Sequence, residues 1–526
     1  MSAPRQTLLK ALVACILLFS LDSGVSASPV YTDLHDFTCA SEGCQPFMPA
    51  LLAQARTGNL YGTTSSGGSS GVGTVYKVTP AGTVTTLYNF ASTTGANPYG
   101  GLTLGTDSNL YGTTYNGGLF GKGTIFKITA AGALTVLHDF GSVAGDGANP
   151  LAPPVQGTDG KFYGVTLYGT AYKITSSGVY TIINAATFGT YAPLIQASDG
   201  NFYGTSGDDN VVFKMTAAGA ISTLYTFNGT YGSHPYGPVI QGADGNLYGT
   251  SAYGGASGMG VVFKLTLNGV ISILKNMDAT LNTPFAGLVA ATDGNFYGAT
   301  LFGGASGKGV LFKITTTGTS TIESNFDGAH GADPYATPIQ HTNGKIYGLM
   351  NSGGINGAGV LYSQDEGLAP FVAMTSSAAK VGVSVGILGQ GFTGTTAVSF
   401  GGTAATFTVV SAAYMTSTVP VSALTGTVTV TTPTGTLTSN RVFQVTPAIL
   451  SFTPTSGAVG TPVIITGSGL TQVTKVTFGG KAATLITVNS DSQVTATVPT
   501  GAVTGKVVIT TNGGTVTSTG NFTVTP

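Results

Sequence analysis

Short, mostly apolar runs cover much of the chain, and glycine-rich polar segments separate them. One unit contains an apolar run at residues 109–114, a glycine-rich run at 116–123 and another apolar run at 124–129. The apolar runs are rich in Val, Ile, Thr, Tyr and Phe and are bounded by Gly, Asp and Asn, as is typical of β-strands and hairpins. The pattern therefore predicts an all-β protein.

This unit recurs seven times, at intervals of 40 to 52 residues. Its Tyr-Gly pair begins at Tyr61, Tyr111, Tyr163, Tyr203, Tyr248, Tyr297 and Tyr347. Such a period is typical of propellers and solenoids. Each unit contains four strand-like runs, which in the second unit are residues 101–105, 109–114, 124–129 and 134–140. Four antiparallel strands in each of seven units predict a seven-bladed β-propeller over residues 28–367.

The two ends of the repeat array complement each other. The fourth strand of a unit carries a Leu-x-x-Phe pattern, as at residues 87–90, but the seventh unit stops after its third strand at 359–363. A matching segment occurs at residues 34–37. We therefore expect the N-terminal strand to complete the last blade and close the ring, which leaves no exposed edge.

Loop lengths predict a functional face. The connections between strands two and three, and between strand four and the next unit, are long and glycine-rich, and in a meander both emerge on the same side. The third and fourth units lack the Gly-Gly-x-x-Gly-x-Gly run, which predicts a notch with Asp208 and Asp209 at its edge. These acids are either part of a polar turn or contacts for a ligand or cation.

The connections between units hold the other binding candidates, His234, His330 and Asp333. His330 and Asp333 could share a cation or a proton, but a solvated loop is the favoured interpretation, because the pair is not repeated from blade to blade. Exposed aromatic residues expected on the same face suit sugar rings, but packing between blades explains most of them equally well. These aromatic candidates are Tyr99, Tyr231, Tyr236, Phe302 and Tyr335.

No catalytic residue is predicted, because the sequence contains no Gly-x-Ser-x-Gly, His-Glu-x-x-His or P-loop motif. Repeated acids do occur in the turns between the first and second strands. They are Asp107, Asp159, Asp199, Asp244 and Asp293. Asp is favoured in turns by its hydrogen bonds to the backbone. The Asp-Gly pairs predict two-residue hairpins with φ > 0 at both positions.

Beyond residue 367 the composition shifts toward Thr, Val and Ala, and an approximately eighty-residue unit occurs twice. Residues 396–406 correspond to 474–484, and Val419-Pro420 corresponds to Val498-Pro499. The strand-like runs of each copy predict two immunoglobulin-like β-sandwiches, at residues 368–446 and 447–526.

The second copy resembles the IPT/TIG family through Pro454-Thr455-Ser456-Gly457, residues 460–470 and Val476-Thr477-Phe478-Gly479-Gly480. The first copy departs at its opening, residues 374–377. The repeats, with residues 244–250 and 309–315, resemble those of choice-of-anchor tandem-repeat GloVer-containing proteins of bacteria. These resemblances imply an exported protein whose sandwich domains act as spacers or interaction modules, and they imply no established activity.

The N-terminus and the composition restrict location and partners. Arg5, Lys10, the apolar residues 11–21 and the small residues 25–27 predict a signal peptide over residues 1–27, and no later apolar run is long enough to span a membrane. Only 7% of the 526 residues are charged and the net charge is -1, so a nucleic-acid partner is not expected.

Two cysteines, Cys39 and Cys44, lie in one short loop after this signal. In an oxidising compartment such a pair most simply forms a disulfide, and metal binding is a weaker alternative, because two thiolates are an incomplete site. No motif indicates a cofactor or a metal, and calcium is left open although no motif indicates it.

Three functions fit these features. The first is a secreted or cell-surface bacterial binding protein, without enzymatic activity and monomeric, whose long-loop face binds a glycan or an extracellular protein. The second is an extracellular enzyme that acts on a polysaccharide or an ester with acids from the long loops. The third is a structural component of the cell envelope. The sequence favours the first, because its acids do not form a catalytic motif.

Overall fold

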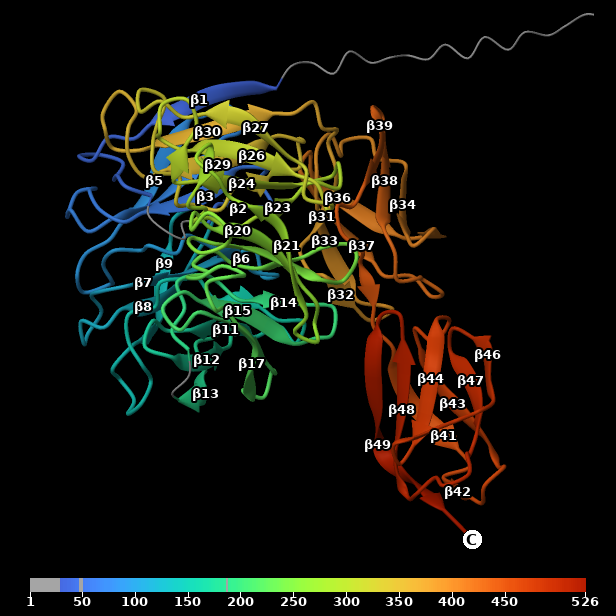
Figure 1. Ribbon diagram of the computed structural model, residues 1–526. Helices are drawn as coiled ribbons and strands as arrows, with labels where there is room; N and C mark the ends of the chain where they lie inside the picture. Colours follow the sequence, from blue (N-terminus) through green and yellow to red (C-terminus); the bar gives the residue numbers. More distant parts are fainter. Residues whose placement is uncertain (1–28, 47–50, 186–187) are drawn as a thin grey trace, which may run out of the picture.

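The computed structural model describes residues 29–46, 51–185 and 188–526. The predicted signal peptide lies outside the described residues. All regular elements in these ranges are β-strands, which confirms the all-β prediction. Figure 1 shows a large assembly of sheets, followed by two smaller units toward the C-terminus.

The large assembly consists of seven four-stranded antiparallel sheets. Six of them follow the chain order, one repeat to a sheet. The first three of these contain β2 (Ala53–Gln54), β3 (Leu60–Thr64), β4 (Thr74–Val78) and β5 (Val84–Asn89); β6 (Thr103–Leu104), β7 (Leu110–Thr114), β8 (Thr124–Ile128) and β9 (Leu134–Asp139); and β10 (Val155–Gln156), β11 (Phe162–Val165), β12 (Thr170–Ile174) and β13 (Tyr180–Ala185). The next three contain β14 (Ile195–Gln196), β15 (Phe202–Ser206), β16 (Val211–Met215) and β17 (Ile221–Thr226); β18 (Ile240–Gln241), β19 (Leu247–Ser251), β20 (Val261–Leu265) and β21 (Ile271–Asn276); and β23 (Val289–Ala290), β24 (Phe296–Thr300), β26 (Val310–Ile314) and β27 (Ser320–Asn325).

The remaining sheet joins the two ends of the repeat array. Its strands are β28 (Ile339–Gln340), β29 (Ile346–Met350), β30 (Val360–Asp365) and β1 (Val30–Asp36). The N-terminal strand β1 runs antiparallel to β30, with Val30 opposite Asp365 and Asp36 opposite Val360. The fourth strand of this sheet therefore comes from the start of the chain.

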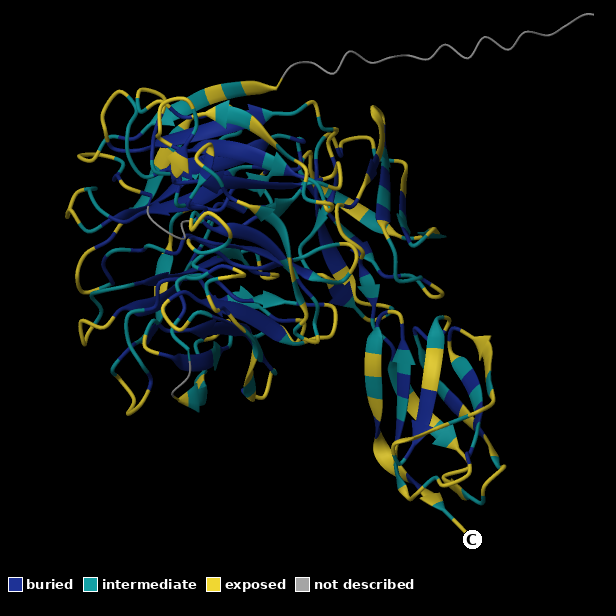
Figure 2. Cartoon of the chain, in the orientation of Figure 1, coloured by how far each residue is buried: buried dark blue, intermediate teal, exposed yellow. Residues whose placement is uncertain are grey.

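The second and third strands of each sheet are buried along nearly their whole length (Figure 2). On the second strand, the glycine of each Tyr-Gly pair lies directly opposite an aromatic residue of the third strand, such as Gly249 opposite Phe263. The seven pairs are Gly62 with Tyr76, Gly112 with Phe126, Gly164 with Tyr172, Gly204 with Phe213, Gly249 with Phe263, Gly298 with Phe312 and Gly348 with Tyr362. A Cβ atom on any of these glycines would lie 2.3 to 2.8 Å from atoms of that ring.

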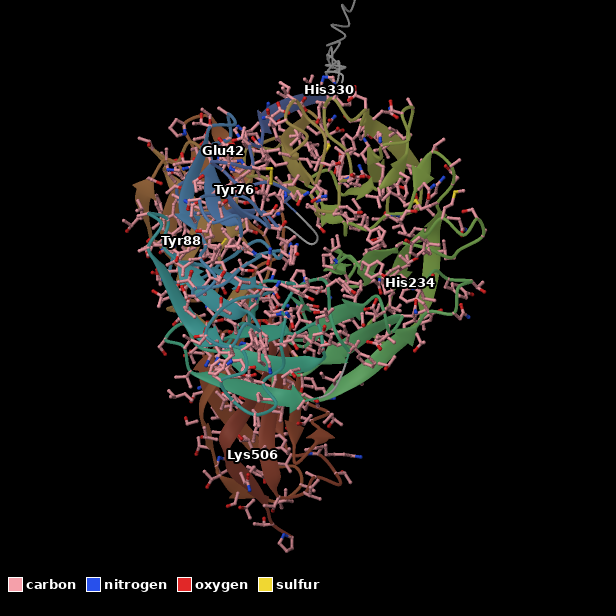
Figure 3. All side chains as sticks on the ribbon, turned by 90° about the vertical axis from the view of Figure 1, so that its left-hand side faces the viewer. Glu42, Tyr76, Tyr88, His234, His330 and Lys506 are labelled. Carbon is pink, nitrogen blue, oxygen red and sulfur yellow. A yellow bond between two sulfur atoms is a disulfide. The ribbon has the colours of Figure 1, made fainter. Side chains whose placement is uncertain are left out.

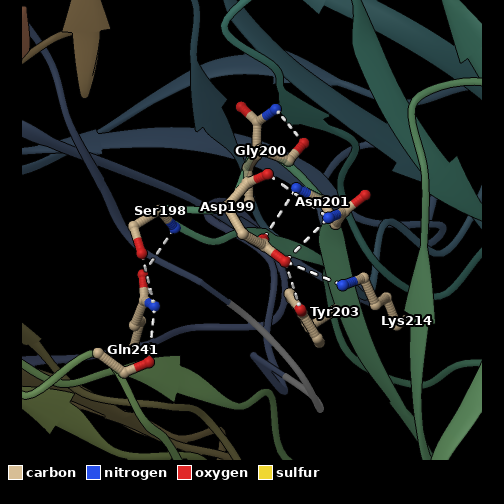
Figure 4. Close-up of polar contacts among 9 residues, drawn as sticks. Ser198, Asp199, Gly200, Asn201, Tyr203, Lys214 and Gln241 are labelled. Carbon is tan, nitrogen blue, oxygen red and sulfur yellow. Dashed lines mark hydrogen bonds and ion pairs between the residues drawn. The ribbon is translucent and has the colours of Figure 1, made fainter. Parts of the chain in front are cut away.

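The turn acids have a structural role, as the sequence predicts. Asp199 shows the arrangement (Figure 4): its carboxylate accepts hydrogen bonds from the Tyr203 hydroxyl at 2.8 Å and from the Asn201 amide at 3.1 Å, and it pairs with Lys214 at 3.0 Å. The predicted φ > 0 at both turn positions is wrong. Only the glycines, such as Gly200 with φ of 80°, adopt it, because the loop is a three-residue turn that ends in a left-handed glycine.

Glutamines at the ends of the first strands connect neighbouring sheets. Gln241 accepts a hydrogen bond from the amide of Ser198, in the turn of the preceding sheet, at 2.8 Å (Figure 4). Gln54 of the first sheet does the same with Thr342 of the last, at 3.0 Å. Bonds of this kind link several neighbouring sheets, and Figure 3 shows that the sheets lie radially around a common centre.

The C-terminal third forms two sandwiches with the same strand order. The first contains β31 (Ala373–Met374), β33 (Ser384–Leu388), β37 (Tyr414–Thr418) and β36 (Phe407–Ser411), which face β35 (Thr403–Ala404), β34 (Ala397–Phe400), β38 (Val428–Thr432) and β39 (Gly435–Thr438); β32 (Ala378–Ala379) runs parallel to β40 (Gln444–Val445). The second contains β41 (Ala448–Thr453), β43 (Pro462–Ser468), β47 (Gln493–Thr497) and β46 (Ile486–Ser490), which face β42 (Ser456–Gly457), β49 (Gly514–Val524), β48 (Gly505–Thr511), β44 (Val473–Phe478) and β45 (Lys481–Ala482). A two-stranded pair, β22 (Leu281–Asn282) with β25 (Phe302–Gly303), lies in the loops of the large assembly.

The first sandwich contacts the short turns of the large assembly. Arg56 lies over the ring of Tyr414 at 4.5 Å, and the side-chain amide of Gln390 donates to the Thr342 hydroxyl at 2.9 Å. Figure 1 shows the sandwich on the side opposite the long loops. The long-loop face is therefore not covered by the rest of the described chain.

Replacing Gly249 with Ala tests the glycine and aromatic pairing. The new Cβ would lie 2.6 Å from Phe263, whose side chain is fully buried. Because the ring has no free space to enter, we expect the Gly249→Ala variant to lose about 1–3 kcal/mol of unfolding free energy, measured by scanning calorimetry.

Gly520→Ala is the matched control, because this glycine lies in strand β49 with no heavy atom within 4 Å of the added Cβ. Shortening the ring with Phe263→Leu should restore part of the stability of the Gly249→Ala variant. An unchanged unfolding free energy of the Gly249→Ala variant would show that contact with the ring does not exclude a larger residue at this position.

Candidate functional site

Most connections between sheets share one backbone conformation on the long-loop face. In six of them a residue with φ between 55° and 57° precedes a proline: Gln45, Asn97, Asn149, His234, Thr283 and Asp333. The carbonyl of each such residue accepts a hydrogen bond from the following sheet, as His234 does from the amide of Ala252 at 3.1 Å. His234 and Asp333 thus hold equivalent positions, where their backbones join neighbouring sheets.

The shortened loop of the fourth repeat changes the hydrogen-bond partner of this connection. There the amide of His234 donates to the side chain of Asn210 at 2.7 Å, whereas Asn149 and Thr283 donate to backbone carbonyls of the longer loops. The ring of Tyr236 occupies the space above Gly207, where an added Cβ would lie 2.3 Å from the ring. The missing loop therefore makes room for an aromatic side chain.

Tyr236 belongs to a group of aromatic side chains that we call the aromatic patch: Tyr191, Tyr236, Tyr253, Phe285 and Tyr335. The ring centres of Tyr191 and Tyr236 are 5.1 Å apart, those of Tyr236 and Phe285 4.9 Å, and those of Phe285 and Tyr335 5.5 Å. Tyr253 is 41% exposed and the others are half-buried. Four of these residues come from consecutive connections that lead into the innermost strands, and Tyr253 comes from the glycine-rich loop between β19 and β20.

Two predicted site residues, Asp208 and His234, lie at this patch. Asp208 accepts a hydrogen bond from the Tyr191 hydroxyl at 2.9 Å, and the His234 ring lies 5.8 Å from that of Tyr236 and 5.4 Å from that of Tyr253. The His234 Nδ1 atom is buried and has no hydrogen-bond partner among the described residues. The sequence did not show that the predicted notch, at Asp208, lies next to the connection that contains His234.

The electrostatics of the patch favour neutral hydroxyl groups. Burial, and then the hydrogen bond to Asp208, raises the pKa of Tyr191. Burial also raises the pKa of Tyr236 and of Tyr335, and the nearby carboxylates of Asp208 and Asp333 add to these shifts. The phenols therefore remain protonated at physiological pH and can donate hydrogen bonds.

The other predicted residues have hydrogen-bond partners outside this group. Asp209 accepts from the Ser206 hydroxyl at 2.7 Å within its own turn. His330 pairs with Asp327 at 2.8 Å, and Asp333 accepts from the Ser352 hydroxyl at 2.5 Å. The proposed sharing of a cation or proton by His330 and Asp333 is thus replaced by two separate local pairs. Figure 3 shows His330 and His234 far apart on the large assembly.

A surface hollow of about 380 Å³ lies on the same face, beside the third repeat. Lys122, Asp146 and Tyr168 line it together with the glycine-rich loop 141–148. Asp146 is buried, and its carboxylate contacts His138 at 2.9 Å and the Gly141 amide at 2.8 Å. Because these partners hold the loop in place, Asp146 serves to shape the hollow.

Cys39 and Cys44 form a disulfide in the structure. In the described part of the chain, no group of three or more His, Cys, Asp or Glu side chains is placed to hold a metal ion. Within the same residue ranges, no helix is long and apolar enough to cross a membrane.

Family comparison accounts for most of the chain. The Gloeobacter/Verrucomicrobia repeat model matches residues 17–175 and 167–362. The chain belongs to this repeat family. The IPT/TIG domain model matches residues 447–524, so the resemblance seen in the second sandwich is confirmed. No curated protein matches the chain.

Solved structures resemble the chain only distantly. A streptogramin B lyase is 16% identical, with 65% of this chain and 99% of the lyase covered and a TM-score of 0.48. A fungal alcohol oxidase in complex with copper is 13% identical, with 77% and 98% covered and a TM-score of 0.45. A surface glycan-binding protein from Prevotella bryantii is 18% identical, with 28% and 38% covered and a TM-score of 0.22. These similarities are too remote to assign an activity.

The Gloeobacter/Verrucomicrobia repeats also contain a feature that the sequence-based interpretation missed. The last residue of the fourth strand accepts a hydrogen bond from the glycine-rich loop at 2.8 Å in five sheets, through Asp36, Asn89, Asp139, Asn276 and Asn325. The two sheets without this loop have Ala185 and Thr226 there. The sequence signal for this contact was the Asn or Asp that precedes the apolar residue after the fourth strand.

His341 provides a pH-dependent contact between the last repeat and the first. Its Nε2 donates to the Gly58 carbonyl at 2.8 Å, and its Nδ1 accepts from the Asn343 amide at 3.1 Å. Burial lowers the pKa of this imidazole below its ordinary value of 6.5. The unfolded chain therefore binds the proton more readily, and the free energy of unfolding decreases as the pH falls below about 6.5.

We expect the His341→Gln variant to lose less thermal stability between pH 7 and pH 5 than the wild type does. His330→Gln is the control, because pairing with Asp327 raises the pKa of His330. The small contribution of His330 to the free energy of unfolding is therefore lost as the pH rises, which is the opposite direction to that of His341. A His341→Gln variant that is as sensitive to acid as the wild type would contradict this role.

Proposed function

We propose that this chain is a secreted or cell-surface bacterial protein that binds a glycan or an extracellular protein through its long-loop face, without enzymatic activity. The aromatic patch beside Asp208 is the observation that carries this proposal. It combines partly exposed ring faces with neutral hydroxyl donors and a carboxylate acceptor, which is the composition that recognises a polar ligand with apolar faces.

The position of the sandwiches supports this function. The first sandwich contacts the short-turn face, through Tyr414 and Gln390, and leaves the long-loop face open. A pair of sandwiches on the opposite side acts as a spacer that directs this face away from the attachment point. The proposed export agrees with the disulfide between Cys39 and Cys44, since such bonds persist in oxidising compartments.

The domain arrangement in this proposal has three parts. Residues 28–367 form a seven-bladed propeller that the N-terminal strand closes, and residues 368–446 and 447–526 form two IPT/TIG-like domains, the whole being a monomer. The pairing of β1 with β30 and the contact between Gln54 and Thr342 support closure. The equal strand orders of the two sandwiches support placing the first in the same class.

A glycan array probed with the protein and with Tyr236→Ala tests the binding proposal. We expect the wild type to bind, and loss of the Tyr236 ring to weaken binding about two- to tenfold, as for one aromatic contact. Gly207→Ala should weaken it too, because the added Cβ displaces Tyr236 without removing any polar group.

Phe302→Ala is the matched control. Phe302 is 47% exposed in β25 and makes no ring contact with the aromatic patch. Equal loss of binding in Phe302→Ala and Tyr236→Ala would place the binding surface elsewhere. The wild type could instead bind no glycan but capture a defined extracellular protein, and Tyr236→Ala could abolish that capture. This result would keep the long-loop face as the binding surface and identify the ligand as a protein.

Removing residues 29–37 tests the closure. This deletion removes β1 and the fully buried Phe37, whose ring packs 5.2 Å from Tyr76 of the first sheet. We expect the propeller to unfold at a clearly lower temperature, because the loss of one buried Phe alone costs about 3–5 kcal/mol. The control lacks residues 447–526 and should keep the propeller transition. An unaffected transition after removal of β1 would argue against a closed ring.

A further inference from the structure

The aromatic patch extends further around the ring than one small ligand would need. Four of its rings follow one another, from Tyr191 through Tyr236 and Phe285 to Tyr335, with centre distances of 4.9 to 5.5 Å. They come from consecutive repeats, so they form an arc around the centre of the long-loop face. A single sugar ring covers only one or two of these side chains.

Other aromatic side chains lie on the loops of the preceding repeats. The ring centres of Tyr115 and Tyr99 are 5.4 Å apart, and Tyr168 is 68% exposed and lines the hollow of about 380 Å³ beside Lys122. The distances between ring centres define one path of aromatic side chains, which runs from Tyr191 to Tyr335.

The charges along this path do not favour a polyanion. Asp208 and Asp333 contribute carboxylates, and Lys122 is the one lysine that lines the hollow. Lys122 forms no ion pair among the described residues. Because the path carries no positive excess, an acidic polysaccharide would lose its counterions without compensation, whereas an uncharged sugar chain would not. Phenol hydroxyls, a carboxylate and an ammonium group all suit sugar hydroxyls.

From this arrangement we infer that the long-loop face binds an uncharged linear polysaccharide, several of whose sugar rings contact the arc from Tyr191 to Tyr335 at once. This inference rests on the proposed function and specifies its ligand class. Its consequence is a dependence of affinity on chain length, because each additional sugar ring contacts a further aromatic side chain.

Affinity electrophoresis of the protein in gels that contain xylan, galactomannan, mixed-linkage glucan or polygalacturonate identifies the class. We expect retardation by at least one of the three neutral polysaccharides and none by polygalacturonate. Calorimetric titration with the disaccharide and hexasaccharide of the retained polymer then measures the length dependence. The hexasaccharide should bind at least about tenfold more tightly than the disaccharide.

Variants at the two ends of the arc locate the chain. Tyr191→Ala and Tyr335→Ala should each weaken hexasaccharide binding about two- to tenfold, whereas Tyr335→Phe, which keeps the ring, should bind like the wild type. Phe302→Ala is the control for a general effect of removing an exposed aromatic residue.

The outcomes separate this inference from the proposed function. Equal affinity for the disaccharide and hexasaccharide, abolished by Tyr236→Ala, would overturn the extended site and leave a glycan-binding protein. Retardation by polygalacturonate alone would overturn the uncharged class. Absence of retardation by any polysaccharide would overturn the inference, and the glycan array and protein capture described above would then decide the proposed function.

Discussion

The contact between a glycine on the second strand and an aromatic ring on the third is the constraint on which the rest of the structure depends. In each of the seven sheets the ring occupies the space that a Cβ atom would fill, within 2.3 to 2.8 Å of its position. This close contact lets the large side chain lie flat against its own sheet, where it also packs against the neighbouring sheet, as Phe126 packs 5.2 Å from Phe90. The strand pairing and the packing between sheets therefore both require the glycine of each Tyr-Gly pair.

The two faces of this assembly differ because their connections differ. On the short-turn face, carboxylates bind tyrosine hydroxyls within the sheet, and glutamines bond to the preceding turn, as Gln241 does to Ser198. Most polar groups there are occupied by structural partners, and part of the face contacts the first sandwich. On the long-loop face, backbone hydrogen bonds hold the connections, so aromatic side chains such as Tyr253 remain partly exposed. A rigid scaffold with variable side chains on one face is the usual arrangement for binding.

Loss of two loops gives this face its asymmetry. The repeats that contain Tyr168 and Asp208 lack the glycine-rich run, and their fourth strands end in Ala185 and Thr226 in place of the Asn or Asp that binds it. Gly207 then lies under Tyr236, and Tyr168 opens toward the hollow. The same change in the repeat thus makes room for the aromatic patch and for the hollow.

The sequence alone determined that the protein is all-β, that it contains a repeat and two sandwich units, and that the repeated acids lie in turns. These features depend on local patterns of apolar residues, glycine and aspartate. It also located Asp208 and His234 on the long-loop face. Only the tertiary structure decided that these two meet at Tyr191 and Tyr236, that His330 pairs with Asp327, and that Asp333 binds Ser352. Apart from the pair of His330 and Asp327 and the ring contact of His234, which each lie within one connection, these contacts join residues from different loops, and their distances depend on how neighbouring sheets pack, which no local pattern encodes.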